Sequence, residues 1–305
     1  MPAPDAVTTG RPGATRPVRS GPAVLMVLGS CVSLQVGAAL AAQLFDTSGP
    51  AGTTLLRLGV AALVLLALAR PRLRSWSRPQ WRAVALFGGS LAGMNGSFYA
   101  SIDRIPLGTA VTIEFLGPLV LAATQSRRLR DLGWVLLAGI GVALFGLGDG
   151  TGPGLDRLGV LFALSAAVFW ALYILASSRV GALVPGQGGL AVAMAVGALV
   201  LAPLGAHGAA QALPDPHLLL LVGGTALLAS VVPYTLEFAA LRRLPERVFG
   251  VLLSLEPAVA TLAGWLLLGQ GTTALGLVAV AVVVSASVGS TLTARPTPQA
   301  VAAAP

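Results

Sequence analysis

The feature that most constrains the fold of this sequence is a series of ten apolar segments, each about long enough to cross a lipid bilayer. A membrane-spanning helix needs about 20 mostly apolar residues. The apolar runs are continuous, whereas the strands of a membrane β-barrel alternate between apolar and polar positions. The sequence therefore predicts an all-α membrane protein with ten transmembrane helices. The segments are residues 23–43, 52–70, 81–101, 107–126, 131–149, 159–178, 188–206, 217–238, 247–268 and 272–293.

The composition excludes most soluble classes of protein. Only 10% of the 305 residues are charged and 55% are hydrophobic, whereas a soluble globular domain has about 25% charged residues. The sequence contains no Ser/His/Asp spacing typical of a hydrolase, and His207 and His217 have no cysteine or acidic cluster around them. Cys31 is the single cysteine, so no intrachain disulfide can form. We expect neither an enzyme nor a bound metal ion or cofactor.

The arginines predict the orientation in the membrane, because cytoplasmic loops are enriched in basic residues. All 19 basic residues are arginines. With the N-terminus inside, sixteen lie in the inner segments, only Arg104 and Arg157 lie in outer loops, and Arg57 lies within the second span. Both termini are therefore expected in the cytoplasm, with 23–43 retained as an uncleaved helix. The same asymmetry explains the net charge of +8 without a nucleic-acid partner.

An internal duplication is visible when residues 99–120 are aligned with residues 238–259. Pro106 then falls on Pro245 and Pro118 on Pro257. The duplicated unit has five spans, and because five is odd the second unit enters the membrane inverted, as in many secondary transporters. The predicted organisation is a disordered cytoplasmic tail, a first repeat, an outer linker, a second repeat and a disordered tail, at residues 1–22, 23–149, 150–158, 159–293 and 294–305.

Two acids inside predicted spans indicate an interior site. A carboxylate at the centre of a bilayer costs about 2.5–3.5 kcal/mol on insertion scales, yet Glu114 and Glu256 both lie deep in their segments. Gly117, Pro118 and Pro257 follow the two acids, and proline breaks or kinks a helix. Backbone groups freed at a break must face protein or water, so we expect a water-accessible cavity there. The alternative is that each acid pairs with an arginine or makes a structural hydrogen bond while protonated.

Further polar and aromatic residues at membrane depth are candidates for the same cavity. Asn95 and Tyr234 occupy equivalent repeat positions near the middle of their spans. Trp170 and Tyr173 share one helix face and either form a substrate wall or pack between helices. The remaining two candidate residues for the cavity are Tyr99 and Gln35.

Two charged residues near span ends have competing interpretations. Arg57 either extends to the outer interface or faces an acid or a substrate carboxylate inside the cavity. Glu237 lies close to Arg242 and Arg243, which favours an interfacial ion pair over a role in binding. Glycines spaced four residues apart, such as Gly89 and Gly93, predict close helix packing.

Four stretches resemble the EamA family of the drug/metabolite transporter superfamily, and within it the inner-membrane threonine and homoserine exporters. The resemblance covers residues 23 to 292, and its more specific motifs are IPLGTAVTIEFLGPL and VPYTLEFAALRRLPERVFGVLLSLEPA. The four stretches are LRLGVAALVLLALARPR, NGSFYASIDRIPLGTAVTIEFLGPLVLA, FWALYILASSRVG and SVVPYTLEFAALRRLPERVFGVLLSLEPAVATLAGWLLLGQ.

The resemblance implies a multi-pass transporter of the bacterial cytoplasmic membrane that expels small amino acids, driven by the proton motive force. Its partners would be an amino acid, protons and the lipid bilayer. A zwitterion needs an anionic group for its ammonium and donors for its carboxylate, which Arg57, Tyr234 or a half-helix N-terminus can supply. Glu114 or Glu256 would bind the ammonium or carry the coupled proton. The alternative is an exporter of other metabolites or hydrophobic cations, with the acids and Trp170 as a cation cage.

Overall fold

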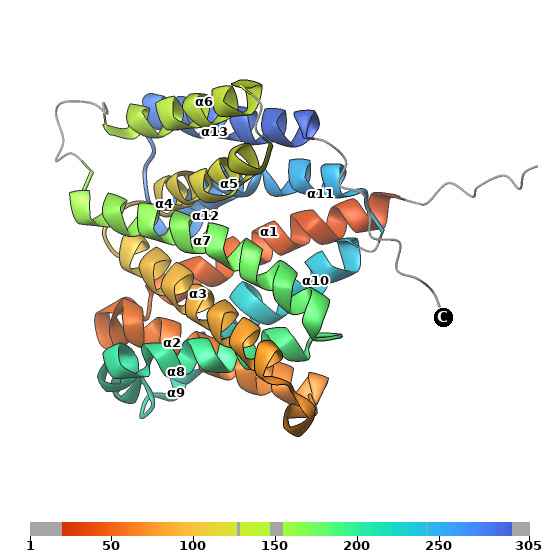
Figure 1. Cartoon of the computed structure of the whole chain (residues 1–305). Coiled ribbons are helices and arrows are strands. Elements are labelled where there is room, and N and C mark those ends of the chain that lie inside the picture. The colour runs from red at the N-terminus through yellow and green to blue at the C-terminus, as the bar shows by residue number, and fades with distance from the viewer. Residues whose placement is uncertain (1–19, 127–128, 147–154, 242, 295–305) are drawn as a thin grey trace, which may run out of the picture.

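The computed structural model describes residues 20–126, 129–146, 155–241 and 243–294, and every regular element in these ranges is a helix (Figure 1). The predicted all-α class is therefore confirmed. The first half contains α1 (Ser20–Ala42), α2 (Phe45–Ala69), η1 (Leu73–Ser75), α3 (Arg78–Ile102), α4 (Leu107–Glu114), α5 (Leu116–Ser126) and α6 (Leu129–Gly146). The second half contains α7 (Arg157–Leu183), α8 (Gly188–Ala212), α9 (Pro216–Ala226), η2 (Leu227–Val231), α10 (Val232–Leu241), α11 (Glu246–Leu253), α12 (Glu256–Leu268) and α13 (Ala274–Thr293).

In the described part of the chain, eight helices, some of them interrupted, have the length and the apolar composition that a membrane span requires. They are Gly21–Ala42, Phe45–Ala69, Leu107–Ser126, Arg157–Leu183, Gly188–Ala212, Pro216–Leu241, Arg247–Leu268 and Ala274–Thr293. The other two predicted spans, 81–101 and 131–149, correspond to helices α3 and α6, which are not among the eight, and residues 147–149 lie outside the described residues. Residues 20–22, assigned to a tail from the sequence, are helical, while the rest of that tail, residues 295–305 and most of the linker 150–158 lie outside the described residues.

Two predicted spans are interrupted at equivalent places, and the prolines explain where. Helix α4 ends at Glu114 and α5 begins at Leu116, while α11 ends at Leu253 and α12 begins at Glu256. Proline has no backbone N–H and its ring clashes with the carbonyl four residues earlier. For Pro118 that carbonyl belongs to Glu114, and for Pro257 it belongs to Leu253. Each first half-helix therefore ends at the residue whose carbonyl loses its partner.

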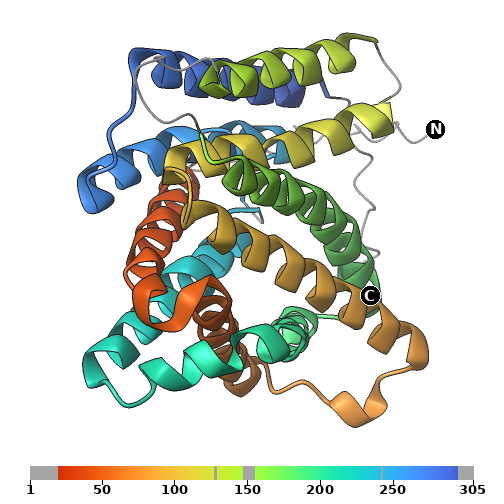
Figure 2. The same ribbon diagram turned by 90° about the vertical axis from the view of Figure 1, so that its left-hand side faces the viewer.

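The helices pair across the two halves of the chain. Helix α1 packs against α10, α2 against α8, α3 against α7, α4 against α12, and α6 against α13. Both views show α6 and α13 side by side along one edge of the bundle and α2 and α8 at the opposite edge (Figures 1 and 2). The middle of the bundle contains α1, α3, α4 and α7. It also contains the interrupted segments α9–η2–α10 and α11–α12, and the site lies among these elements.

Glycines allow a close approach between α2 and α8. A Cβ atom on Gly52 would lie 2.8 Å from the backbone nitrogen of Ala209, and one on Gly205 would lie 2.5 Å from the carbonyl oxygen of Ala51. Small residues let membrane helices approach until their backbones touch, where dispersion forces act over the whole contact. At these positions the backbones of α2 and α8 pack directly against each other.

The glycines named from the sequence meet different surroundings. At Gly93 an added Cβ would lie 2.5 Å from the ring of Phe169, so the predicted close contact is confirmed. At Gly89 nothing lies within 4 Å, and that prediction is wrong. Its neighbour Gly88 makes the contact instead, since a Cβ there would lie 2.6 Å from the carbonyl oxygen of Ala193 on α8. A four-residue spacing places residues on one face, but it does not say which face meets a partner.

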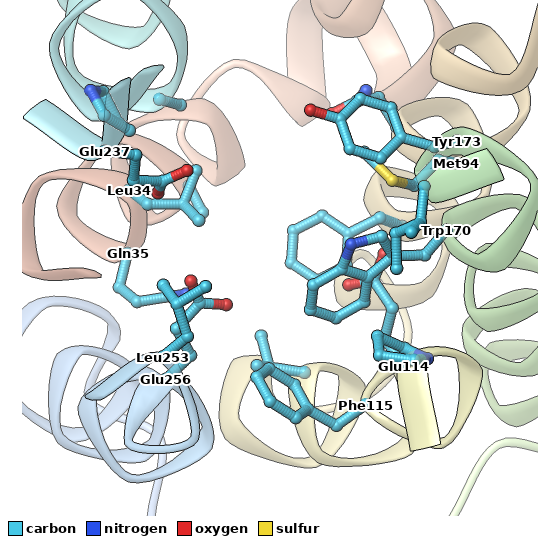
Figure 3. A pocket seen from close by; sticks show the side chains of 18 of the residues that line it. Leu34, Gln35, Met94, Glu114, Phe115, Trp170, Tyr173, Glu237, Leu253 and Glu256 are labelled. Carbon is cyan, nitrogen blue, oxygen red and sulfur yellow. The ribbon is translucent and has the colours of Figure 1, made fainter. Parts of the chain in front are cut away.

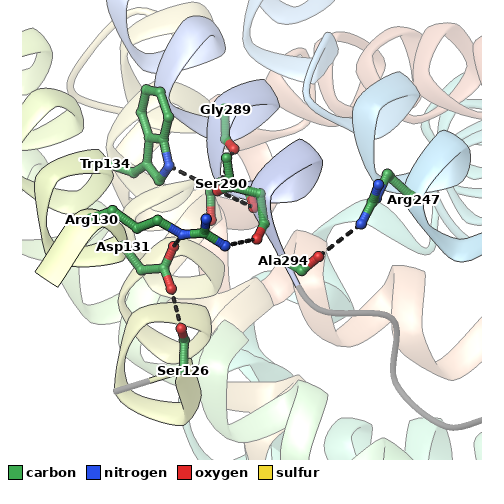
Figure 4. Close-up of polar contacts among 9 residues, drawn as sticks. Ser126, Arg130, Asp131, Trp134, Arg247, Gly289, Ser290 and Ala294 are labelled. Atoms are coloured by element: carbon green, nitrogen blue, oxygen red, sulfur yellow. Dashed lines mark hydrogen bonds and ion pairs between the residues drawn. The ribbon is translucent and has the colours of Figure 1, made fainter. Parts of the chain in front are cut away.

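At one end of the bundle, polar side chains hold the last turn of α13 (Figure 4). Arg130 donates to the carbonyl of Thr293 and forms an ion pair with Asp131 at 3.6 Å. The indole nitrogen of Trp134 donates to the Thr293 hydroxyl at 3.0 Å, and Arg247 donates to the carbonyl of Ala294 at 2.8 Å. The final carbonyls of a helix have no partner within it, so these contacts join α13 to α6 and α11.

At the other end, the loops after α3 and before α7 meet. Arg104 and Asp156 form an exposed ion pair at 3.5 Å, and the Ser101 hydroxyl donates to the carbonyl of Gly159 at 2.9 Å. Asp156 is the N-cap of α7 and accepts a hydrogen bond from the Gly159 N–H. That hydrogen bond is the main reason why the pKa of Asp156 lies below its ordinary value, and Arg104 adds to the effect.

We expect Gly52→Ala to lower the stability of the folded protein by about 1–3 kcal/mol, because the new methyl group is forced against the backbone of α8. Gly59→Ala, seven residues later on the same helix, is the matched control, since nothing lies within 4 Å of its Cβ position. The measurement is thermal unfolding of the two detergent-purified variants. Equal melting temperatures for both would contradict the close approach of α2 and α8.

Candidate functional site

A cavity of about 370 Å³ lies in the middle of the bundle. Its lining comes from both halves of the chain, from α1, α2, α3 and the α4–α5 break as well as from α7, the η2–α10 segment, the α11–α12 break and α13. The volume falls within the range of small-molecule sites, about 300–1,000 Å³. All nine residues that the sequence predicted for a binding site contribute to this lining: Gln35, Arg57, Asn95, Tyr99, Glu114, Trp170, Tyr173, Tyr234 and Glu256.

The lining is arranged as two facing walls (Figure 3). One wall carries Gln35 on α1 together with Glu237 on α10 and Glu256 at the start of α12. The opposite wall carries Glu114 at the end of α4 and Trp170 on α7. Acidic side chains therefore face the cavity from both sides, and the aromatic surface is concentrated opposite α1.

Glu114 and Glu256 are buried and yet unpaired. The two residues are 8% and 5% exposed. Within the described part of the chain, neither carboxylate makes a hydrogen bond or an ion pair, and the two ion pairs that do occur, Arg104–Asp156 and Arg130–Asp131, lie outside the cavity. The alternative of a structural pairing with arginine is therefore not what the structure shows. A carboxylate without a protein partner leaves its oxygens available to a ligand or a proton.

The helix breaks account for the positions of these acids. Glu114 is the last residue of α4, and Glu256 is in the first turn of α12. The N-terminus of a helix favours negative charge, because its first N–H groups are unpaired and its dipole is positive there. Pro118 lines the cavity directly, whereas Pro257 lies behind Glu256 outside the lining. Gly117 also lies outside the lining, where its missing side chain lets α5 approach the backbone of Ala167 on α7.

Arg57 is an interior residue rather than an interfacial one. It is 4% exposed, and one guanidinium nitrogen donates to the carbonyl of Ala229 at 3.2 Å. The second terminal nitrogen donates to the side-chain oxygen of Asn95. Asn95 in turn donates to the carbonyl of Leu91 at 2.8 Å, which fixes the direction of its amide. The guanidinium carbon also lies 4.8 Å from the centre of the Tyr99 ring, within the range of a cation–π contact.

Three buried polar atoms of the cavity lining have no hydrogen-bond partner among the described residues. Among the described side chains, the Arg57 Nε, the Tyr99 hydroxyl and the Gln35 side-chain oxygen are buried without a hydrogen bond. Buried polar groups in native proteins are nearly always satisfied by protein, water or ligand. Three such groups from α1, α2 and α3 on one cavity therefore indicate a place where a polar ligand or water molecules bind.

Trp170 and Tyr173 on the second wall each pack against a phenylalanine ring. Trp170 meets Phe115 edge-to-face, with ring centres 5.0 Å apart, and Tyr173 lies 5.1 Å from Phe87. The rings both pack between helices and line the cavity, so the two interpretations offered from the sequence are not exclusive. Whether these residues bind substrate stays a prediction.

Glu237 is a cavity residue that sequence reasoning assigned to the interface. It lines the cavity, and its carboxylate accepts a hydrogen bond from the Ser30 hydroxyl at 2.5 Å. Arg243, one of its expected partners, points its guanidinium at the sulfur of Met26 instead, and Arg242 lies outside the described residues. A usable indication was present, because Glu237 follows Tyr234 by three residues and so shares its helix face.

Comparison with known proteins agrees with this architecture. Residues 157–292 match the EamA-like transporter family. The chain is 41% identical over 289 residues to "Threonine/homoserine exporter RhtA" of Salmonella typhimurium (strain LT2), which covers 94% of the chain and 97% of that relative. It is 40% identical over 285 residues to the exporter of the same name in Escherichia coli (strain K12), covering 93% and 96%.

A solved structure titled "Crystal structure of protein" shares the fold. It has a TM-score of 0.62 and 21% identity, and it covers 90% of this chain and 97% of that chain. The relatives are transporters rather than enzymes, and with its apolar helices the chain is a multi-pass protein of the bacterial inner membrane. The resemblance noted from the sequence motifs is confirmed: the chain belongs to the EamA-like transporter family and is a relative of the threonine/homoserine exporters.

Proposed function

We propose that this protein exports small amino acids of the threonine/homoserine class across the cytoplasmic membrane, by proton-coupled alternating access. The observation that carries the proposal is a cavity in which one oriented guanidinium and unpaired carboxylates face the same space. An amino acid is a zwitterion and needs both kinds of group. The printed names of the relatives point to the same class of substrate.

In this proposal Arg57 binds the substrate carboxylate. Asn95 and the carbonyl of Ala229 hold two of its nitrogens, so the guanidinium is oriented before the substrate arrives. The unpartnered Arg57 Nε and the Gln35 and Tyr99 side chains of the same cavity supply further polar contacts. Hydrogen bonds between charged groups are about twice as strong as neutral ones, and a binding group that is already oriented loses little entropy when the ligand binds.

Glu114 and Glu256 divide the two remaining tasks, with one accepting the substrate ammonium and the other a proton. An isolated carboxylate in a low-dielectric interior is costly while charged, so an empty cavity with two such groups favours protonation of at least one. When the substrate leaves, a proton can replace its positive charge. The cavity can then open to the other side of the membrane without moving an uncompensated charge across it.

The packing of the helices supports ten spans arranged as two repeats of five, over residues 23–149 and 159–293. In the two-repeat arrangement each span has an equivalent five spans away, so that α7 is the equivalent of α1 and α3 is the equivalent of α10. The observed pair α1–α10 then corresponds to the observed pair α7–α3. The pairs α2–α8, α4–α12 and α6–α13 map onto themselves. A two-fold relation between the halves produces this pattern, and because five is odd its axis must lie in the membrane plane.

The contacts at the two ends of the bundle support the proposed orientation, with both termini in the cytoplasm. On the side expected outside, Arg104 pairs with Asp156, and the Leu107 N–H donates to the side-chain oxygen of Gln270. The segments that meet through Arg130 and Arg247 are those expected inside. Loops assigned to one side by their arginine content thus contact loops of the same side.

We expect Glu114→Gln and Glu256→Gln each to lower threonine export at least tenfold, because an amide carries no charge to neutralise the ammonium and does not take up and release a proton near neutral pH. The measurement is efflux of labelled threonine from loaded cells, with membrane levels checked by immunoblot. Asp103→Asn is the matched control, because it removes a carboxylate at an exposed position outside the cavity. Normal export by both glutamine variants would refute the proposed site, and export of a cationic dye in place of threonine would favour the alternative substrate class.

The division of tasks predicts different behaviour of the two variants. If the glutamine variant removes the proton carrier, threonine-for-threonine exchange in proteoliposomes should continue. Uphill transport driven by a pH gradient should be abolished. If the glutamine variant removes the ammonium-binding residue, both exchange and uphill transport should be abolished. Loss of both reactions in both variants would contradict a separate proton carrier.

The orientation predicts the accessibility of cysteines placed in a Cys31→Ala background. Gly271→Cys lies in an expected outer loop and Arg78→Cys in an expected inner one, and both positions are exposed. A membrane-impermeant maleimide should label the first in intact cells and the second only after lysis. The reverse result would invert the topology, and labelling of both in intact cells would contradict the span count.

A further inference from the structure

The cavity contains more negative groups than the proposed function uses. Glu114, Glu237 and Glu256 face it, whereas Arg57 is the one arginine in its described lining. A bound zwitterion adds one charge of each sign, and one coupled proton neutralises one further acid. With Glu114 and Glu256 assigned to these tasks, Glu237 remains without a role.

Glu237 has the surroundings of a prepared binding group. The Ser30 hydroxyl donates to its Oε1 atom at 2.5 Å, and Ser30 itself is fully buried. The other carboxylate oxygen has no described protein donor, and the side chain points into the cavity from the α10 wall (Figure 3). No arginine of the described chain lies within ion-pair distance of it. One oxygen is therefore held in place while the other is available.

Glu237 lies far from the place where Arg57 would bind a carboxylate. Arg57 contacts the carbonyl of Ala229, and Glu237 lies about two helical turns further along the same η2–α10 segment, roughly 12 Å at the rise of a helix. A threonine bound at Arg57 keeps its only ammonium group on the carbon next to its carboxylate. A ligand that also reaches Glu237 needs a second cationic group on a longer chain.

The space between these two points suits such a chain. Tyr234 lies three residues before Glu237 on α10, and Tyr173 and Trp170 line the cavity from the opposite wall (Figure 3). Aromatic faces pack against methylene groups and attract an ammonium ion. The cavity of about 370 Å³ has the volume of roughly twelve water molecules at ~30 Å³ each, which is more than a molecule with the eight non-hydrogen atoms of threonine fills.

We propose that Glu237, positioned by Ser30, is a second cation-binding subsite, and that the protein also exports α-amino acids whose side chain ends in an amine. The inference rests on the proposed function, because it uses Arg57 as the carboxylate site. The α-ammonium group binds at Glu114 or Glu256, as in threonine, and the terminal ammonium binds at Glu237. No bond is made or broken, and the preference arises from the complementary charge at the far end of the cavity.

The experiment compares lysine, its uncharged analogue norleucine, and threonine in proteoliposomes that contain the full chain. We expect the wild-type protein to transport lysine and threonine, and lysine to compete with threonine more strongly than norleucine does. Glu237→Gln should lower the ratio of lysine to threonine transport at least tenfold. Glu237→Asp, which keeps the charge on a shorter side chain, should recover part of that ratio, and Ser30→Ala should give an intermediate value.

The outcomes separate this inference from the proposed function. Failure of lysine to be transported or to compete in the wild-type protein overturns the subsite, whether or not any variant folds. An equal loss of lysine and threonine transport in Glu237→Gln also overturns it, because Glu237 would then serve every substrate. Absence of threonine transport in the wild-type protein overturns the proposed function, and lysine transport that depends on Glu237 would in that case still support the subsite.

Discussion

The whole structure depends on one constraint, that lipid offers no hydrogen bonds to a polypeptide backbone. Pro118 and Pro257 each deprive a carbonyl of its partner, and the chain responds by ending α4 at Glu114 and α11 at Leu253. Interrupted backbone is tolerated at this depth only where protein or a water-filled cavity covers it. The breaks must therefore face the centre of the bundle, and the acids next to them are carried into the same space.

The same constraint explains why the charged groups of the site are supported by neutral ones. Arg57 is held by the Asn95 amide and the Ala229 carbonyl, and Glu237 is held by the Ser30 hydroxyl. Direct pairing of the arginine with an acid would satisfy both charges but would leave neither for a ligand. Orientation by amide, carbonyl and hydroxyl groups keeps the charge of each residue available at the cavity surface, which a transporter of zwitterions requires.

Much of the site was accessible to sequence reasoning, because polar residues at membrane depth are costly and therefore point inward. That argument brought together Glu114, Glu256, Asn95 and Arg57, which line one cavity. It was not applied to Glu237, which lies near an arginine pair in the sequence and was assigned to the interface. Proximity in sequence suggested an ion pair with that arginine pair, whereas Arg243 contacts Met26 and the Glu237 carboxylate contacts Ser30 on another helix.

The sequence alone determined the helical class, the membrane location and the presence of two helix breaks, because length, hydropathy and proline chemistry act locally along the chain. The breaks were predicted at Gly117, Pro118 and Pro257, whereas the first half-helices end about one turn earlier, at Glu114 and Leu253. Only the tertiary structure decided which helices meet and what each polar group touches. Gly88 rather than Gly89 contacts α8. Asn95 lines the cavity and also accepts a hydrogen bond that orients Arg57. These outcomes depend on the rotation and crossing of packed helices, which arise from many contacts between residues far apart in the chain.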